Sequence, residues 1–440
     1  MIFKKTFKGG IHLNEHKNTA GAEIDLGFSP DKVTIPMQQH IGAPCSCIVK
    51  KGDTVKRGQL IGEPAANLSC AVHSSVSGTV ADVCELISIG GQKVVHVIIE
   101  NDKENTNDDS VVPKDYTKMS PDEITEAIKQ SGISGMGGAT FPTYAKIKSA
   151  VGKVDTLIVN CSECEPYITA NHRLMVERPD EMLGGIRILL KALSLPLAKI
   201  AIADNKPDAI GILKKKTSGC KDIKVEVVKT KYPQGDERQL IFAITGRQIP
   251  TGKLPADVGC VVFNAETTEA VYNYFAKGEP LIEKIVTVDG DCVVSPKCVL
   301  APIGTSYEDL IAYCGGTTAE PKKIVSGGPM MGFSVWTEKT PVSKGCSSVL
   351  VFANSEDQAP TENNSCIRCG KCVKACPMHL MPSYIANYAR KDLLSECDKL
   401  GARSCVECGS CSYVCPAKIP VSQYVRTAKA KINAKARRAK

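Results

Sequence analysis

Eight of the 21 cysteines in this 440-residue chain fall into two runs with the same spacing. Both runs read C-x2-C-x2-C-x3-C-P, the first over residues 366–377 and the second over residues 405–416. Two-residue spacers let three thiolates meet one face of a [4Fe–4S] cluster, while the fourth cysteine of each run reaches the other cluster. Zinc sites usually use two C-x2-C pairs instead. The spacing therefore predicts two iron–sulfur clusters.

This crossed pattern assigns four ligands to each cluster. We expect the first cluster to be held by Cys366, Cys369, Cys372 and Cys415. We expect the second cluster to be held by Cys405, Cys408, Cys411 and Cys376. The intervening residues 381–402 have a helical pattern, which predicts an α-helical two-cluster module with Cys397 as a packed thiol.

A glycine-rich stretch, SGISGMGGATFPTYAK at residues 131–146, is the second place where the sequence predicts chemistry. A Walker loop would need lysine after its last glycine, and a dinucleotide fingerprint would need glycine or alanine where Thr140 stands. A capping box at residues 120–123 predicts a helix that stops at Gly132, and we expect a second helix near Pro142. Backbone N–H groups of a glycine loop at the start of a helix can hold a phosphate group.

The elements that must position these residues are short apolar segments that alternate with helical stretches. These segments lie at residues 154–159, 198–203, 223–228 and 260–263. Such segments are typical of strands in a parallel sheet that is buried on both faces. Polar loops follow the four strands, and ligands collect beyond the carboxyl ends of strands in open α/β sheets. The sequence therefore predicts a ligand site at this edge of the sheet.

The predicted iron–sulfur clusters and a nicotinamide nucleotide differ in how many electrons they transfer in one step. Iron–sulfur clusters pass single electrons, whereas nicotinamide delivers a hydride, and a flavin is the usual converter between them. A chain with two clusters and a phosphate loop is therefore predicted to be a flavin-dependent NADH oxidoreductase.

Composition narrows the class of protein further. The chain has no apolar run of about 18 residues and no signal-peptide pattern, so we expect a cytoplasmic chain that does not cross a bilayer. The net charge of +8 is concentrated in residues 426–440, which carry seven basic side chains and no acid. This distribution argues against nucleic-acid binding. We interpret the tail as a solvated end, with contact to anionic lipid or an acidic partner as the alternative.

Motifs spread over nearly the whole chain resemble the C subunit of the Rnf complex, the membrane ferredoxin:NAD+ oxidoreductase. They are FKGGIHLNEHK, GMGGATFPT, NCSECEPYITANHRLM, KYPQGDERQL, SGGPMMG and both cysteine runs. The core is similar to the FMN-bearing, NADH-oxidising subunit of respiratory complex I. One alternative is a cobalamin reductase of the propanediol-utilisation type, in which the barrel-sandwich domain comes late in the chain. Another is an electron-wire scaffold without an active nucleotide site.

The resemblance implies a multidomain α/β protein. Its parts would be an N-terminal barrel-sandwich hybrid with linker at 1–110, a Rossmann-like FMN/NADH core with a parallel sheet at 111–283, a β-grasp (SLBB-like) domain at 284–352, an α-helical two-cluster ferredoxin module at 353–425, and a basic tail at 426–440. Barrel-sandwich domains present a modifiable lysine at a hairpin tip, but here the tip reads His73-Ser74-Ser75, so we expect it to pack or dock. We expect the SGGPMMG segment to pack near the first cluster.

The resemblance also assigns the nucleotide site. The phosphates of FMN and NADH would lie against Gly135, Gly137 and Gly138, with Lys146 beside them and Phe141 against adenine. The flavin and nicotinamide pocket would be lined by Asn160, Ser162, Glu163 and Glu165. The remaining residues would be Gly235, Asp236 and Glu237 in a G-E-E-like turn, and Asn264 and Thr267 at FMN. Ser162 and Asp236 depart from the Asp and Glu of the complex I subunit. Phe141 could instead be a hydrophobic staple, and Lys146 a solvated helix charge.

The implied function is hydride exchange between NADH and FMN, followed by single-electron transfer through two [4Fe–4S] clusters. The partners would be the other subunits of a membrane complex that translocates Na+ or H+, with ferredoxin as an indirect partner. The chain would then lie peripherally at the cytoplasmic face of the cell membrane.

Overall fold

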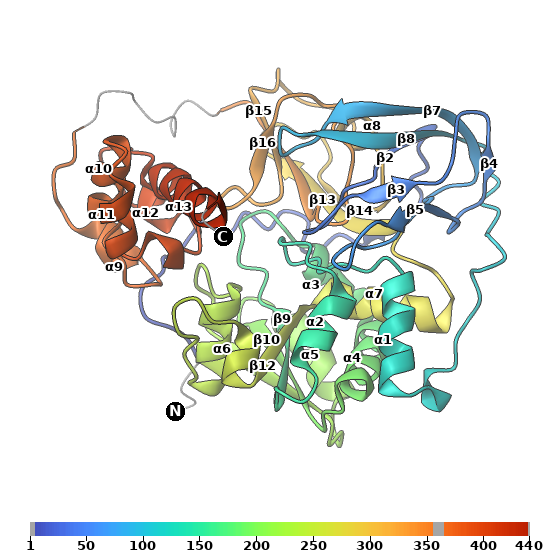
Figure 1. The fold of residues 1–440 in the computed structure, drawn as a ribbon, viewed down its shortest axis with the longest axis horizontal. Coiled ribbons are helices and arrows are strands. Elements are labelled where there is room, and N and C mark those ends of the chain that lie inside the picture. Colours follow the sequence, from blue (N-terminus) through green and yellow to red (C-terminus); the bar gives the residue numbers. More distant parts are fainter. Residues whose placement is uncertain (1–4, 355–364, 439–440) are drawn as a thin grey trace.

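The computed structural model describes residues 5–354 and 365–438. Figure 1 shows an α/β part, a β-rich part that joins the N-terminal strands to residues 283–352, and a helical module with both cysteine runs. Predictions for residues 1–4, 355–364 and 439–440, which belong to the first, fourth and last predicted domains, lie outside the described residues. No helix within the described ranges is long and apolar enough to span a membrane.

The α/β part is built on four parallel strands, as the sequence predicts. Their order across the sheet is β11 (Ile223–Val228), β10 (Ala198–Ala203), β9 (Thr156–Cys161) and β12 (Cys260–Asn264). The helices of this part are α1 (Pro121–Gln130), α2 (Thr143–Ala150), α3 (Ala170–Glu177), α4 (Pro179–Leu193), α5 (Pro207–Lys216), α6 (Glu237–Thr245) and α7 (Ala265–Ala276). Strand β9 lies two residues later than predicted and β12 extends one residue further, so both strands include their asparagines, Asn160 and Asn264.

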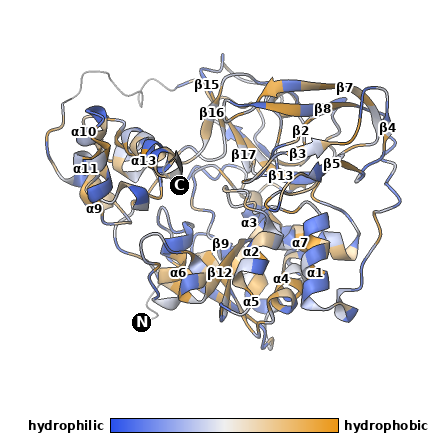
Figure 2. Ribbon diagram, in the orientation of Figure 1, coloured by the Kyte–Doolittle hydropathy of each residue, from blue (hydrophilic) through white to orange (hydrophobic). Residues whose placement is uncertain are grey.

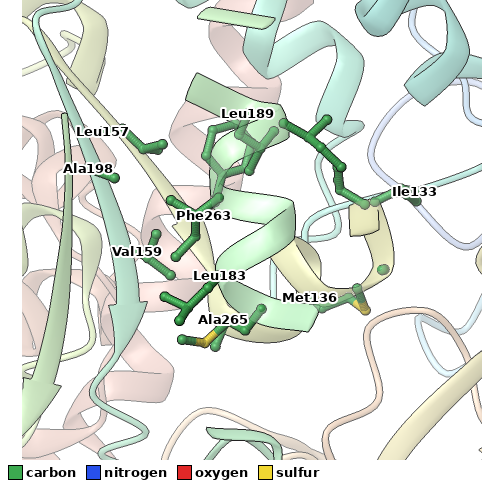
Figure 3. Close-up of a cluster of buried hydrophobic side chains, with 14 of the residues drawn as sticks. Ile133, Met136, Leu157, Val159, Leu183, Leu189, Ala198, Phe263 and Ala265 are labelled. Carbon is green, nitrogen blue, oxygen red and sulfur yellow. The ribbon is translucent and has the colours of Figure 1, made fainter. Parts of the chain in front are cut away.

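Helices cover both faces of this sheet, because strands β10, β9 and β12 are mostly apolar on both faces. On one face, Leu157, Val159 and Phe263 of the strands pack against α4 residues Leu183 and Leu189 (Figure 3). On the other face, the strands pack beneath α6. This packing fixes the strands and leaves the loops at their carboxyl ends to carry polar groups.

The N-terminal strands form two small sheets around a shared apolar core. One sheet has the order β2 (Lys32–Pro36), β8 (Lys93–Asn101), β7 (Gly78–Ile87) and β4 (Thr54–Val55), and the other has β3 (Cys45–Cys47), β5 (Leu60–Pro64) and β6 (Val72–His73). The tip at residues 73–75 is buried, and Ser75 Oγ donates a hydrogen bond to the carbonyl of Ile303. The tip therefore packs against the rest of the molecule instead of being presented to solvent.

A mixed sheet of six strands lies beside the α/β part. Its order is β1 (Ile24–Asp25), β14 (Lys297–Pro302), β13 (Glu283–Gly290), β17 (Ser348–Phe352), β15 (Lys323–Ser326) and β16 (Phe333–Val335), with helix α8 (Tyr307–Tyr313) between β14 and β15 in the chain. Strands β13 and β14 are antiparallel, and β13 pairs in parallel with β17. The N-terminal strand β1 closes one edge of this sheet.

The helical module contains α9 (Lys371–Ala375), α10 (Pro382–Arg390), α11 (Leu394–Lys399), α12 (Ser410–Tyr413) and α13 (Val421–Arg438). The predicted packed thiol Cys397 is buried in its core, together with Ala428 and Ile432 of α13. The prediction of a solvated tail from residue 426 is therefore wrong as far as Ile432, because α13 has hydrophilic and hydrophobic residues (Figure 2) and covers α10 and α11 with its apolar face, whereas residues 433–435 are exposed.

Candidate functional site

The glycine loop lies at the carboxyl edge of the parallel sheet, between α1 and α2. Its backbone is held by two contacts: the amide of Gly135 donates to the carbonyl of Phe141 (2.8 Å), and the amide of Met136 donates to Thr267 Oγ1 (3.0 Å). Thr267 thus positions the loop. Gly138 is exposed and has φ +111°, a conformation that side chains rarely adopt, and the space beside it is open. The loop therefore presents backbone that a ligand can approach closely.

Loops that follow three different strands meet beside the glycine loop. Asn160 and Asn264 are register partners at the ends of β9 and β12, and Gly137 lies against Asn264. Asn160 Nδ2 donates to the carbonyl of Gly235 (2.8 Å), while Asn160 Oδ1 accepts from the amide of Ser162 (3.1 Å). Residues assigned to the nucleotide from separate parts of the sequence are thus brought together.

Three helices point their N-termini at this edge, and each is capped by an assigned residue. Glu163 accepts from the amides of Asn171 and His172 at the start of α3 (2.7 and 3.1 Å). Asp236 caps α6, and Asn264 caps α7. Helix N-termini carry partial positive charge and favour phosphate. Burial raises the pKa of Asp236 to about 6, although the capping amides oppose the shift.

Lys146 is tied to the strand ends. Its Nζ donates to the carbonyl of Val262 (3.0 Å) and lies 3.4 Å from Glu237 Oε2. The charge of this lysine is therefore at the site and not free on the helix surface. Phe141 is half-buried at the junction between the glycine loop and α2.

Two lysines outside the predicted set hold the loop after β9. Lys17 Nζ donates to the carbonyls of Glu163, Glu165 and Ile168 at 2.5–3.0 Å. Lys206 is buried, and its Nζ donates to the carbonyl of Ser162 (2.8 Å). Burial and the charge of Lys17 lower the pKa of Lys206 to about 8. Both lysines belong to stretches that stand out in the sequence: the FKGGIHLNEHK motif and the polar end of β10.

A pocket open to solvent lies between this loop, the N-terminal segment and the ends of β10 and β11. Its lining includes Ser162, Glu163, Glu165 and Gln234. The hydroxyl of Ser162 and both polar atoms of the Gln234 side chain are buried, with no hydrogen-bond partner among the described residues. Buried polar groups are normally paired, so these atoms fit a site that a polar ligand completes. Together with the glycine loop and the helix N-termini, they suit a flavin mononucleotide.

Glu165 connects this cavity to the cysteine module. Glu165 Oε2 accepts from the amide of Met330 (3.0 Å), and Oε1 lies 3.3 Å from Tyr232 Oη, which donates to the carbonyl of Cys408 (2.8 Å). Burial raises the pKa of Glu165 to about 7. The Tyr232 hydroxyl has one hydrogen, and the carbonyl of Cys408 is its closer acceptor.

The four thiols assigned to the second cluster line one cavity. Its lining includes Cys376, Cys405, Cys408 and Cys411. The amides of Leu380 and Glu407 lie 3.3 Å from the sulfurs of Cys376 and Cys405. Within residues 5–354 and 365–438, no three Cys, His, Asp or Glu side chains meet closely enough for a single metal ion. Four thiols spaced around a cavity fit a cubane cluster instead.

The first set of cysteines lies nearer the surface. Cys366 and Cys369 are exposed, whereas Cys372 and Cys415 are half-buried. The two sets therefore differ in burial, with the second set adjoining the α/β part.

Two glycine motifs from distant parts of the chain pack around the second set. The amide of Gly10 donates to the carbonyl of Ala375 (2.9 Å), and a Cβ on Gly9 would come within 2.6 Å of the carbonyl of Cys376. The carbonyl of Met330, in the SGGPMMG segment, lies close to Gly409. The prediction that this segment packs near the first cluster is wrong, because it contacts the loop of the second set.

Four family models match the chain in sequence order. They are the RnfC barrel sandwich hybrid domain (residues 5–104), the Nuo51 FMN-binding domain (128–273), the SLBB domain (285–334) and the 4Fe-4S dicluster domain (365–419). NAD+-reducing [NiFe]-hydrogenase in its air-oxidised and H2-reduced states shares the fold over 71% of this chain and 61% of that chain, with TM-scores of 0.52 and 0.51 at 19% identity. Fold and site thus define an iron–sulfur flavoprotein.

Curated relatives identify the family. The chain is 44% identical to the C subunit of the proton-translocating ferredoxin:NAD(+) oxidoreductase complex of Clostridium ljungdahlii, over 99% of this chain and 96% of that protein. It is 44% identical to the C subunit of the Na(+)-translocating ferredoxin:NAD(+) oxidoreductase complex of Acetobacterium woodii, over 98% of each. It is 39% identical to the C subunit of the ion-translocating oxidoreductase complex of Rhodobacter capsulatus, over 97% of this chain and 83% of that protein. The chain belongs to the RnfC family, the C subunits of Rnf complexes.

Proposed function

We propose that this chain is the NADH-reacting electron-transfer subunit of an Rnf-type ferredoxin:NAD+ oxidoreductase. It would exchange hydride between NADH and FMN and pass single electrons through two [4Fe–4S] clusters to the other subunits of a complex that translocates Na+ or H+. It would dock peripherally at the cytoplasmic face of the membrane. The observation that carries the proposal is the junction at which Glu165 and Tyr232 line the cavity after β9 and Tyr232 donates to Cys408 of the second cysteine set.

The FMN phosphate would lie against Gly135, Gly137 and Gly138 and the N-termini of α6 and α7. Adjacent strands are about 4.8 Å apart, so the edge from β12 to β11 spans about 14 Å, which allows a mononucleotide to extend along it. Bound FMN supplies the conversion between a hydride and single electrons. The ring would then lie towards Ser162, with Glu163 and Glu165 on the nicotinamide side and Phe141 and Lys146 at the dinucleotide.

The two cysteine sets would act in a fixed order. Cys376 and Cys408 contact the N-terminal segment and Tyr232, whereas Cys366 and Cys369 are exposed. The second set would therefore face the flavin, and the first set would face the partner subunits. Backbone amides at the sulfurs of Cys376 and Cys405 would tune the potential of the second centre.

The finer architecture is also part of the proposal. A β-grasp fold for residues 284–352 is supported by the strand order β14-β13-β17-β15, with α8 as the crossover after the first hairpin. The other limits, at 1–110 and 111–283, stay as proposed, and α13 suggests that the cluster module includes residues 353–438.

Anaerobic reconstitution tests the proposal. Purified protein loaded with iron, sulfide and FMN should contain about eight irons per chain and one flavin, and NADH should bleach the flavin absorbance. A protein that binds only zinc, or that binds no flavin, would contradict the proposal. Intact clusters with flavin absorbance that NADH leaves unchanged would favour an electron wire instead.

A further inference from the structure

Gln234 has an unusual position for a glutamine. It is fully buried in the turn between Tyr232 and Asp236, yet neither Oε1 nor Nε2 has a hydrogen-bond partner among the described residues. A primary amide offers one acceptor and two donors, and an unpaired buried amide is costly. A chain that keeps such a group gains from it only when another molecule supplies the partner.

The turn does not need this side chain for its own structure. The backbone N–H of Gln234 donates to the carbonyl of Lys231 (2.8 Å), and the carbonyl of Gly235 accepts from the side chain of Asn160. Gln39 is the useful comparison, because it is also buried but its Nε2 donates to the carbonyl of Pro36 (3.1 Å) and its Oε1 accepts from the amide of Lys344 (3.0 Å). Gln39 is therefore structural, whereas the Gln234 amide is free to bind a ligand.

The cavity beside Gln234 defines what the ligand must offer. Ser162 lines the same cavity, and its buried hydroxyl is also unpaired within the described chain. The ligand must therefore present hydrogen-bond donors and acceptors together. The pyrimidine edge of a flavin has this pattern, since its N3–H lies between two carbonyl oxygens, and a carboxamide can accept from the N–H and donate to a neighbouring carbonyl.

We propose that the Gln234 side chain binds the pyrimidine edge of the isoalloxazine ring through paired hydrogen bonds, with the Ser162 hydroxyl as a further contact. This inference rests on the proposed FMN site and adds a residue that recognises the ring itself. The carboxamide of nicotinamide offers similar groups, so the experiment must separate the two ligands.

Two leucine variants separate a ligand contact from a structural one. Gln234→Leu removes the amide at similar volume, so we expect FMN to bind about tenfold or more weakly, while the unfolding midpoint of the flavin-free protein stays the same or rises. Gln39→Leu should lower that midpoint and leave FMN affinity within about twofold, because it breaks paired hydrogen bonds away from the cavity. FMN affinity is measured by quenching of flavin fluorescence.

An N3-methylated FMN provides a second measurement on the unmodified protein. The methyl group removes the N–H donor, so we expect it to weaken binding to the wild type by about tenfold, and to have little further effect in Gln234→Leu. Equal FMN affinity of wild type and Gln234→Leu would overturn the inference, as would a loss confined to NADH affinity. Failure of the wild type itself to bind FMN would overturn the proposed function, and the inference with it.

Discussion

At the scale of single residues, Tyr232 and Glu165 join the cavity at the carboxyl edge of the parallel sheet to the cysteine module. Tyr232 is buried, and its hydroxyl lies between the carbonyl of Cys408 and the carboxyl group of Glu165. Glu165 is also fixed from the other side by the amide of Met330. A side chain at Gly328 would overlap with the Glu165 carboxyl group, so this contact requires glycine there.

Replacing Tyr232 with phenylalanine should loosen the second cysteine loop. The variant loses a hydrogen bond to the carbonyl of Cys408, so we expect the free energy of unfolding to fall by about 1–2 kcal/mol and the potential of the second cluster to shift in an EPR redox titration. Tyr144→Phe is the matched control, because Tyr144 is equally buried and donates to the carbonyl of Asn67 (2.6 Å) away from the cysteines. An unchanged potential in Tyr232→Phe, or the same shift in the control, would contradict this role.

The raised pKa of Glu165 predicts how stability depends on pH. Burial lifts this pKa from 4.5 to about 7, so the folded protein keeps a proton that the unfolded chain loses between those values. Stability should therefore fall as pH rises from about 4.5 to about 7, by up to about 3 kcal/mol, and this contribution should then level off.

Glu165→Gln should remove that dependence, because the amide does not titrate. Urea unfolding at about pH 5 and about pH 8 measures the free energy of unfolding of both proteins. Relative to the wild type, the variant should be more stable at about pH 8 than at about pH 5. If the difference in free energy of unfolding between the two proteins is the same at both pH values, Glu165 is ionised when buried.

At the scale of elements, helix ends and strand ends build the site. The capping box at the start of α1 is present, with Ser120 N donating to Glu123 Oε2 (2.7 Å). Helices α6 and α7 begin at Asp236 and Asn264, and Glu163 accepts from the first amides of α3; all three residues belong to the proposed nucleotide site. Asp236 and Asn264 thus fix the N-termini of α6 and α7, whose partial positive charge faces the place proposed for phosphate.

Helix α13 gives a direct prediction at this scale. Ile432 is buried among α10 and α11, so Ile432→Ala should lower the free energy of unfolding of the helical module by about 2–4 kcal/mol. Thr427→Ala, on the exposed face of the same helix, should change it by less than about 0.5 kcal/mol. Chemical denaturation followed by circular dichroism measures both. Equal, small effects would mean that α13 is not packed in solution.

The elements that depend on local patterns could be predicted from the sequence. The strand at 198–203 matches the structure because it is apolar and almost entirely buried on both faces, whereas 223–228 is the edge strand β11, in which Lys224 is exposed. The prediction for the tail is wrong because its lysines and arginines outnumber the apolar positions, although Val421, Val425, Ala428 and Ile432 recur at helical spacing. Contacts such as Met330 with Glu165 join residues far apart in the chain, and no local pattern encodes them.

The candidate site follows the same division. Strand ends and the glycine loop could be assigned from the sequence, because topology brings carboxyl ends of parallel strands together. The sequence could not assign Lys17, Lys206 and Gln234 to the site. The role of a lysine or glutamine becomes clear only when the structure shows its hydrogen-bond partners, or their absence within the described residues.

At the scale of the whole molecule, three distant segments meet between the flavin core and the cysteine module. The N-terminal motif contacts Ala375 and Cys376, the KYPQGDERQL motif contacts Cys408 through Tyr232, and the SGGPMMG segment contacts Glu165 and Gly409. Figure 1 shows the N-terminal segment running between the helical module and the α/β part. Three of the motifs that carry the family resemblance therefore also hold the α/β part and the cysteine module together.

The central claim is that a hydride enters at a mononucleotide site and leaves as single electrons through the two cysteine sets. Rapid mixing of anaerobic, FMN-loaded protein with NADH, followed by flavin absorbance and low-temperature EPR of freeze-quenched samples, tests it most directly. We expect the flavin to bleach and EPR signals of reduced clusters to appear afterwards. If dithionite reduces the clusters but NADH leaves both the flavin and the clusters oxidised, the account is contradicted.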